Sequence, residues 1–353
     1  VVGLVATGLL MIYSASAMQV YQPNAGGPSQ PLFFVTKQAV AVLLGAVLTI
    51  VAMKLDYRRL DAPRLVAAGL GLLLAALVVV LFRPPINGTR RWIDLGVMSL
   101  QPSEFAKIGL VVALAALLSR REGELDDVKR TLLPVAGLLA VLGGLVLLQP
   151  DFGTALSYFA IAAAMLFYAG LRLRWFAGGA LLAVPALVVY AWSAPYRRAR
   201  ILAFLHPESD PLGSGYQALQ SLIAVGTGGV TGLGLGDGKQ KLFFLPYPYT
   251  DFIYAIVGEE LGLIGCAFVL ALFGMVFARG MRAAVNAPDT FGRLLGLGLA
   301  VMIVVQALVN ISVVLALLPT KGIPLPFLSY GGSALWADLL AVGILLNVSQ
   351  HAP

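Results

Sequence analysis

Apolar residues run through this chain in long stretches, and short polar or glycine- and proline-containing segments separate them. A transmembrane helix needs about 20 mostly apolar residues. Ten stretches fit that requirement, at residues 1–17, 34–53, 64–82, 103–119, 132–149, 152–170, 174–194, 252–278, 292–318 and 327–348. The pattern predicts an all-α, polytopic integral membrane protein with about ten transmembrane helices.

Composition supports this class of protein. Hydrophobic residues make up 59% of the chain and charged residues 12%, with a mean hydropathy of +0.89. A soluble domain carries about 25% charged residues. The deficit extends along the whole chain, which excludes a soluble protein with one membrane anchor. Because residue 1 already lies in an apolar stretch, we expect the sequence to be trimmed at that end, and no removable signal peptide is evident.

Cysteine and histidine are too few for several kinds of site. Cys266 is the single cysteine, and His206 and His351 are the only histidines. These counts exclude a disulfide framework, a zinc site and a histidine proton relay.

Basic residues predict the orientation, because Lys and Arg collect in cytoplasmic loops. Thirteen of the 24 lie in alternate loops, which places these loops and both termini on the cytoplasmic side. The other eleven lie on the outer side or within the membrane, at Lys37, Arg83, Arg90, Arg91, Lys107, Arg197, Arg198, Arg200, Lys239, Lys241 and Lys321. They indicate either a solvated outer loop or a cationic site for an anion such as a pyrophosphate lipid head group.

Residues 195–251, between the seventh and eighth helices, form one long extracytoplasmic loop. Nothing marks a second domain or an internal repeat, so residues 1–353 are predicted to form a single transmembrane domain. The segment "GTGGVTGLGLGDGKQKLFFLPYPYT" lacks the spacing of a Walker A loop or a dinucleotide fingerprint. Two interpretations remain: free backbone N–H groups beside Lys239 and Lys241 approach a ligand, or the loop is flexible and folds over the membrane surface.

The stretch "GYQALQSLIAVG" precedes this glycine-rich segment. It predicts a short amphipathic helix in the outer interface, with Gln217 and Gln220 on one side.

Two further segments carry charges at helix boundaries. "INGTRRWIDLGVMSLQPSEFAKIG" contains Arg90 and Arg91, followed by Glu104 and Lys107 at i, i+3. The latter two either neutralise each other and fix the helix, or Lys107 also faces a substrate cavity. Asp151 in "LQPDFGTA" is placed to cap the next helix, and we favour that role over ligand binding.

Asp251 begins a long apolar run in "TDFIYAIVGEELG", at the outer interface. It either favours the positive start of a helix that Thr250 caps, or it acts as a general base. Glu259 and Glu260 point about 100° apart, so we do not expect a close pair; one would contact the cavity and the other a neighbouring helix.

The last outer loop, "LLPTKGIPLPFLSYGGSALW", carries Lys321 and Ser329. Its prolines and glycines predict irregular backbone, either as a bare loop or as the lining of a cavity.

Taken in order, the motifs "RRWIDLG", "QPSEFAK", "QPDFGTA", "GYQ…QS", "GTGG…GLGLGDGKQK", "TDFIYAIVGEELG" and "LPFLSYGGS" resemble the SEDS family (shape, elongation, division and sporulation), the RodA/FtsW group of bacterial membrane glycosyltransferases. The resemblance covers nearly the whole chain. Tyr247 and Tyr249 stand where family members usually have the Glu of "LPE" and often a His, so no role is carried over to these side chains. "IPLPFLSYGGS" and "RRWIDLG" favour the elongation member, RodA, whereas "LPTKG" is closer to the division member, FtsW.

The resemblance implies an enzyme that polymerises lipid II into glycan strands on the outer face of the bacterial cytoplasmic membrane. Asp251 aligns with the family's essential aspartate and would take the proton of a sugar 4-hydroxyl that attacks the anomeric carbon. One displacement implies inversion without a covalent intermediate. Candidates to stabilise the pyrophosphate leaving group are Arg90, Arg91, Lys107, Lys239 and Lys321. Further candidate substrate-binding residues are Glu104, Asp151, Gln217, Gln220 and Ser329.

The resemblance also implies partners: lipid II, the nascent glycan strand, membrane lipids and a class B penicillin-binding protein, which is a transpeptidase. No nucleic acid is expected. No cofactor is certain, although a divalent cation, Mg or Mn, is compatible with the chemistry. The alternative function is a lipid II flippase. The lack of an inverted repeat and the position of the polar motifs at the outer helix ends favour the enzyme.

Overall fold

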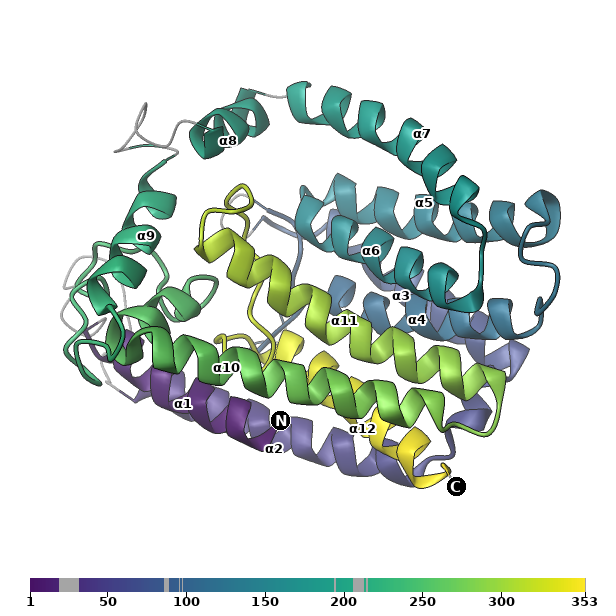
Figure 1. The fold of residues 1–353 in the computed structure, drawn as a ribbon, viewed down its shortest axis with the longest axis horizontal. Helices are drawn as coiled ribbons and strands as arrows, with labels where there is room; N and C mark the ends of the chain where they lie inside the picture. Colours follow the sequence, from purple (N-terminus) through teal and green to yellow (C-terminus); the bar gives the residue numbers. More distant parts are fainter. Residues whose placement is uncertain are drawn as a thin grey trace. The chain divides into compact units, whose positions relative to one another are not determined.

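The computed structural model is built almost entirely from helices, as the apolar pattern predicts (Figure 1). It describes residues 1–18, 32–85, 89–94, 96, 98–193, 195–205, 213 and 215–352. The helices are α1 (Val2–Ser16), α2 (Phe33–Lys54), α3 (Pro63–Leu81), α4 (Pro102–Ser119), α5 (Leu133–Leu148), α6 (Phe152–Ala169), α7 (Leu173–Trp192), α8 (Pro195–Leu205), α9 (Tyr216–Gly228), α10 (Ile253–Val285), α11 (Thr290–Val314) and α12 (Gly332–Gln350). Two short helical segments, η2 (Tyr57–Asp61) and η3 (Val128–Leu132), precede α3 and α5.

Eight described helical segments are long and apolar enough to cross a membrane: α2, α3, α4, η3 with α5, α6, α10, α11 and α12. α1 and the first part of α7 are shorter apolar helices. Together these ten elements correspond to the ten predicted stretches, which confirms a multi-pass, all-α membrane protein. α9 is the short helix predicted from "GYQALQSLIAVG".

The chain forms two compact units, each assembled from separate stretches of sequence. The first unit contains residues 1–40, 176–274 and 306–331. The second contains residues 41–175, 275–305 and 332–353. Helices α2, α7, α10 and α11 therefore each contribute residues to both units.

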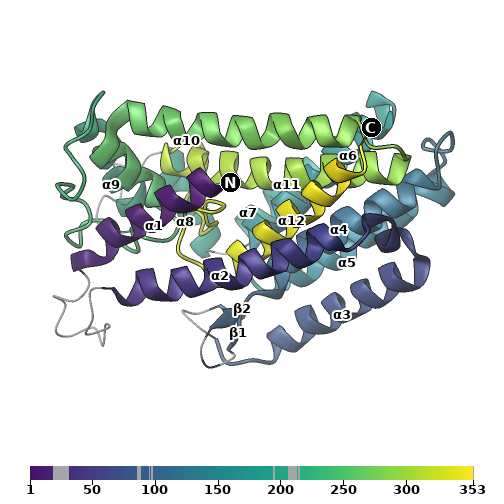
Figure 2. The same ribbon diagram turned by 90° about the horizontal axis from the view of Figure 1, so that it is seen from below.

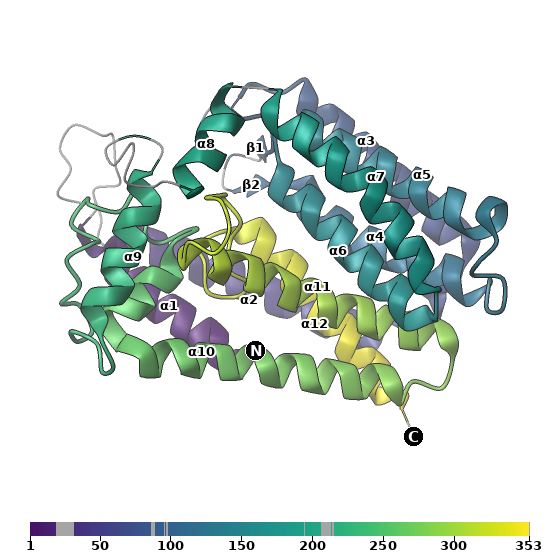
Figure 3. The same cartoon turned by 45° about the horizontal axis from the view of Figure 1, so that its top comes forward.

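In the second unit, α4 is the central helix. α3, α5, α6 and α12 all pack against it, and Figure 3 shows α3 to α6 as neighbours. In the apolar stretch of α4, 72% of the residues are buried, whereas in that of α3 only 11% are. α3 therefore leaves most of its surface for lipid. A short antiparallel hairpin, β1 (Ile93–Asp94) and β2 (Ser99–Leu100), leads into α4 (Figure 2).

In the first unit, α10 is broken near its start. Gly262 has φ 64° and ψ −162°, values that no helix residue adopts. Four backbone groups around this break bond to the loop after α9. The N–H groups of Leu233 and Gly234 donate to the carbonyls of Glu259 and Glu260 (3.0 and 3.1 Å), and those of Leu263 and Ile264 donate to the carbonyls of Gly229 and Val230 (2.9 and 3.2 Å). The loop thus replaces the helical hydrogen bonds that the break removes.

Glycine makes this pairing possible because the two backbones touch. A Cβ on Gly262 would lie 2.3 Å from the backbone nitrogen of Gly232, and one on Gly232 would lie 2.2 Å from the carbonyl oxygen of Glu260. Where α9 meets α10, a Cβ on Gly228 would lie 1.9 Å from the oxygen of Gly258. Close packing of backbone against backbone therefore requires glycine at positions 228, 232 and 262.

α1 runs antiparallel along the first half of α10 (Figures 1 and 2). Gly3 at one end of α1 faces Leu272, and Ser14 near the other end contacts Glu260. The broken segment of α10 is therefore covered by the glycine-rich loop and also by α1.

We predict that Gly262→Ala strongly destabilises the protein. A non-glycine residue in the left-handed region costs about 1–2 kcal/mol, and the added Cβ would also collide with the backbone of Gly232. Thermal unfolding of the detergent-purified protein should show a clear loss of stability. Gly274→Ala, on the same helix with no atom within 4 Å of the added Cβ, is the matched control and should unfold like wild type. Equal behaviour of the two variants would refute the role assigned to the break.

Candidate active site

Asp251 lies in the turn immediately before α10 and lines a small pocket of the first unit. The residues that line this pocket come from α8, α9, the segment before α10 and the loop between α11 and α12. They are Arg200, Gln217, Pro246, Tyr247, Asp251, Phe252, Thr320, Lys321 and Gly322. Three predicted site residues, Asp251, Gln217 and Lys321, are thus brought together. Arg200 joins them; the sequence marked it only as one of the outward cations.

The backbone at Asp251 is held by three consecutive carbonyl contacts. The N–H of Tyr330 donates to the carbonyl of Tyr249 (2.9 Å), and the hydroxyl of Ser329 donates to the carbonyl of Thr250 (2.6 Å). The amide of Asn310 donates to the carbonyl of Asp251 itself (2.8 Å). These contacts fix the position from which the carboxylate projects.

Asn310 also connects Asp251 to the loop that carries Lys321. Its amide nitrogen donates to the carbonyl of Ile323 at 2.7 Å as well as to Asp251. On the same loop, a Cβ at Gly322 would lie 2.7 Å from Oδ2 of Asp251, so a larger residue there would displace this carboxylate. Asn310 is not predictable from the sequence, because a lone asparagine in an apolar helix carries no motif.

Ser329 is buried, and its hydroxyl holds the backbone at Thr250. The same oxygen accepts the N–H of Leu325 (2.7 Å). The segment predicted to be irregular, residues 317–336, is irregular as far as residue 331, and α12 begins at Gly332. Its residues Thr320, Lys321 and Gly322 line the Asp251 pocket, which supports the cavity interpretation.

Thr250 does not cap α10. Its hydroxyl donates to the carbonyl of Tyr247 (3.0 Å), and the helix begins only at Ile253. The capping interpretation is wrong for this threonine, because the turn at residues 250–252 separates it from the helix. Asp251 points its carboxylate at Gly322 in the pocket wall.

Gln217 lies on α9, which is attached to the end of α11 by a hydrogen bond. The hydroxyl of Ser221, one turn further along α9, is buried and donates to the carbonyl of Val314 at the end of α11 (2.7 Å). Gln217 then reaches the Asp251 pocket, whereas Gln220 is not among the described residues that line it.

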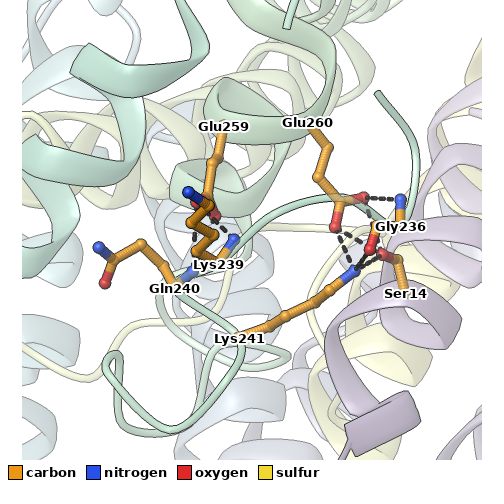
Figure 4. A network of polar contacts seen from close by, with 7 residues as sticks. All are labelled: Ser14, Gly236, Lys239, Gln240, Lys241, Glu259 and Glu260. Atoms are coloured by element: carbon orange, nitrogen blue, oxygen red, sulfur yellow. Dashed lines mark hydrogen bonds and ion pairs between the residues drawn. The ribbon is translucent and has the colours of Figure 1, made fainter. Parts of the chain in front are cut away.

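Glu260 forms a buried clasp around the glycine-rich loop (Figure 4). Its carboxylate accepts the hydroxyl of Ser14 (2.6 Å), the ammonium of Lys241 (2.8 Å) and the N–H of Gly236 (3.1 Å). Lys241 also donates to the carbonyl of Gly236 (2.6 Å). The side chains of Lys241 and Glu260 are 4% and 0% exposed, so this ion pair is shielded from solvent.

The side chain of Glu259 binds the backbone of the same loop. Its carboxylate accepts the N–H groups of Lys239 (2.7 Å) and Gln240 (3.2 Å). The proposal that these N–H groups are free for a ligand is therefore wrong, because the two carboxylates and two carbonyls of α10 occupy them. Glu260 contacts a neighbouring helix, α1, through Ser14, as predicted for one of the two glutamates. Glu259 holds the loop and is not among the described residues that line the Asp251 pocket. The side chain of Lys239 is exposed.

Five other predicted site residues belong to the second unit. Asp151 caps α6, since its carboxylate accepts the N–H of Thr154 (3.2 Å), which confirms the capping interpretation. Arg91 lies 3.7 Å from the same carboxylate and donates to the carbonyl of Gln149 (3.2 Å). Arg90 donates to the carbonyl of Leu81 (2.9 Å). Both arginines thus bind the protein's own backbone.

Glu104 and Lys107 form a buried ion pair at 2.6 Å, with side chains 2% and 3% exposed. This is the neutralising pair that their spacing predicts. The structure adds Asp338 of α12, a fully buried carboxyl that interacts electrostatically with both. Asp338 was not among the predicted site residues, although a lone carboxylate in the apolar run "SALWADLLAVG" is a signal of a buried functional or paired group.

Among the described residues, no group of three or more His, Cys, Asp or Glu side chains could hold a metal ion. Asp251 is the single carboxylate among the described residues lining its pocket. A Mg²⁺ ion uses one or two protein carboxylates together with substrate phosphates. The pocket therefore fits a divalent cation only if substrate oxygens complete the ligand set.

Comparison with known proteins gives a consistent result along the whole length. Residues 1–353 match the model of the cell cycle protein family FtsW/RodA/SpoVE. A probable peptidoglycan glycosyltransferase FtsW from Trichlorobacter lovleyi is 44% identical over 353 residues, covering 99% of this chain and 91% of the relative. A solved structure on the coordination of polymerization and crosslinking by a peptidoglycan synthase complex is similar, with TM-score 0.79, 35% identity and coverage of 99% and 96%. The crystal structure of the rod shape determining protein RodA of Thermus thermophilus gives TM-score 0.71, 31% identity and coverage of 99% and 94%.

We predict that Glu260→Gln costs about 3–5 kcal/mol of unfolding free energy, because it leaves the Lys241 ammonium buried without its counter-charge. The double variant Glu260→Gln with Lys241→Met should recover part of this loss. Thermal unfolding of all variants, analysed as a double-mutant cycle, measures the coupling.

Glu124→Gln is the matched control for this cycle. Glu124 pairs with Arg130 at 3.1 Å, but the side chains are 46% and 61% exposed. Such exposed pairs contribute about 0–1 kcal/mol. If Glu260→Gln were as mild as Glu124→Gln, the clasp would not be a determinant of stability.

Proposed function

Because this chain belongs to the FtsW/RodA/SpoVE family of cell cycle proteins, we propose that it polymerises lipid II into glycan strands at the outer face of the bacterial cytoplasmic membrane. The chain is a multi-pass membrane enzyme, a peptidoglycan glycosyltransferase. One observation carries the finer proposal: Asp251 shares a pocket with two cations, Arg200 and Lys321, and with the amide of Gln217.

Asp251 is the general base of this proposal. The 4-hydroxyl of the acceptor sugar donates to its carboxylate, which takes the proton as the oxygen attacks the anomeric carbon of the donor. The bond between that carbon and the pyrophosphate oxygen breaks in the same step. The product linkage is inverted, no covalent enzyme intermediate forms, and the proton remains on Asp251 until solvent removes it.

Arg200 and Lys321 stabilise the leaving group in this mechanism. The polyprenyl pyrophosphate departs as an anion, and a guanidinium and an ammonium at the pocket wall offset its negative charge. Lys321 was predicted for this role, and Arg200 is added to it. Lys239, Arg90 and Arg91 remain candidates for contacts with the substrate outside this pocket, whereas Lys107 is buried in its ion pair with Glu104.

The rigid backbone around Asp251 supports its assignment as the general base. The three carbonyl contacts from Tyr330, Ser329 and Asn310 hold residues 249–251 before any substrate binds. A base held in advance loses little entropy when the acceptor arrives. A divalent cation such as Mg or Mn, if bound, would be held mainly by the substrate's phosphate oxygens, and it would supply further positive charge for the leaving group.

We assign the chain to the division branch of the family. The sequence motifs favoured elongation, but the FtsW relative is 44% identical whereas the RodA structure is 31% identical. We further propose that residues 1–353 act as one transmembrane domain, with both termini cytoplasmic and residues 195–251 outside. Its partner would be a class B penicillin-binding protein, since a similar structure belongs to a complex that couples polymerization with crosslinking.

The test is glycan-strand formation from labelled lipid II by the purified chain with its transpeptidase partner. We expect Asp251→Ala and Asp251→Asn to lose about 10²–10⁴-fold in rate, because the proton acceptor is removed. Asp237→Asn, an exposed carboxylate on the same loop, is the matched control and should retain full activity. Thermal unfolding and partner binding show that each variant is folded.

Undiminished polymer from the folded Asp251 variants would reduce this residue to a structural role. No polymer from wild type, together with transfer of labelled lipid II across vesicle membranes, would support the flippase instead.

A further inference from the structure

Tyr247 is a large aromatic side chain that is 57% exposed in the wall of the Asp251 pocket. Exposed aromatic residues of membrane proteins often serve as interfacial anchors. Three neighbours on the same loop, Leu242, Phe243 and Phe244, are also exposed, but they do not line this pocket. Its position in the pocket distinguishes Tyr247 from them.

The backbone of Tyr247 is held in an unfavourable conformation. Its φ is +52°, in the left-handed region that non-glycine residues rarely adopt. Two hydrogen bonds retain it there, because both the N–H (3.1 Å) and the hydroxyl (3.0 Å) of Thr250 donate to its carbonyl. The carbonyl of Thr250 in turn accepts the hydroxyl of Ser329 (2.6 Å). The network that fixes Asp251 therefore also holds the backbone from which the Tyr247 ring projects.

The pocket offers three kinds of contact at once. A tyrosine ring has an apolar face and a hydroxyl at its tip. The Gln217 amide both donates and accepts, and the Asp251 carboxylate accepts. The two cations Arg200 and Lys321 attract phosphate.

This combination matches a sugar next to a phosphate. A pyranose has one face of C–H groups, which packs on an aromatic ring, and a rim of hydroxyl groups, which pairs with amide and carboxylate oxygens. A free phosphate or a simple phospholipid head group would need the cations and not the ring. A polyprenyl tail would need an apolar groove, which this mostly polar pocket does not offer.

We propose that Tyr247 is the sugar-binding face of the Asp251 pocket and that it orients the acceptor sugar toward the Asp251 carboxylate. This inference rests on the proposed glycosyl transfer and adds a specificity residue to it. Tyr247 acts by stacking, so its ring matters more than its hydroxyl.

Kinetics of the purified chain with its transpeptidase partner test this inference. We expect Tyr247→Ala to raise KM for lipid II about tenfold, the size of one lost stacking contact, with a smaller change in kcat. Tyr247→Phe keeps the ring and should stay within about twofold of wild type. Phe243→Ala is the matched control: Phe243 is 41% exposed, has φ +71° and lies on the same loop outside the pocket. It should leave KM unchanged.

Binding without turnover provides a second readout. The probe is the soluble GlcNAc–MurNAc disaccharide, observed by saturation-transfer NMR. Wild type and Asp251→Asn should bind it, and Tyr247→Ala should not. Wild-type protein that makes no polymer would reject the proposed function itself. Polymer from wild type with unchanged KM and disaccharide binding in Tyr247→Ala, or equal effects of Tyr247→Ala and Phe243→Ala, would overturn this inference alone.

Discussion

Every backbone N–H and C=O within a membrane must find a partner, and the first unit is built around that requirement. The break at Gly262 removes helical hydrogen bonds from α10, and the loop after α9 restores four of them. Gly228, Gly232 and Gly262 are needed because backbone meets backbone without room for a Cβ. A segment that looks like a ligand-binding loop is therefore first a structural partner of a broken helix.

The same loop then carries the chain to the pocket. Lys241 is fixed by Glu260 and Ser14, and ten residues later the chain reaches Asp251 (Figure 4). Because the clasp is buried, its ion pair is not screened by water, and the start of this segment is held firmly. At the other end, Ser329 and Asn310 hold the carbonyls of Thr250 and Asp251. A carboxylate between two such anchors is placed with little freedom, as a general base requires.

In the second unit, the buried charged side chains pair with one another and stabilise helix packing. Glu104 and Lys107 neutralise each other within α4, and Asp338 of α12 adds a second carboxyl near them. Buried charges without partners are costly, so the pair stabilises the packing of α4 only as long as both members are present. Arg91 and Asp151 join the hairpin to the start of α6 in a similar way. These motif residues have clear structural functions, whatever contacts they also make with substrate.

Local sequence determined the parts of this protein that depend on residues close together in the chain. Apolar runs of sufficient length specified the membrane helices, and the i, i+3 spacing of Glu104 and Lys107 specified their ion pair. Asp151 could be recognised as a cap because its partner, Thr154, is three residues away. Asp251 at the end of the long outer loop and Lys321 in the last outer loop were also identified as candidates, since charges at a membrane boundary need a reason.

Only the tertiary structure decided which of these side chains meet. Asn310, Ser329 and Gly322 contact residues 250–251 from segments 59 to 79 residues away in sequence, and no local pattern encodes such contacts. The break at Gly262 was equally invisible, because a glycine in an apolar run is compatible with a straight helix. Whether a loop N–H is free or already bonded depends on what packs against it, and here Glu259 and Glu260 occupied the groups that composition alone left open.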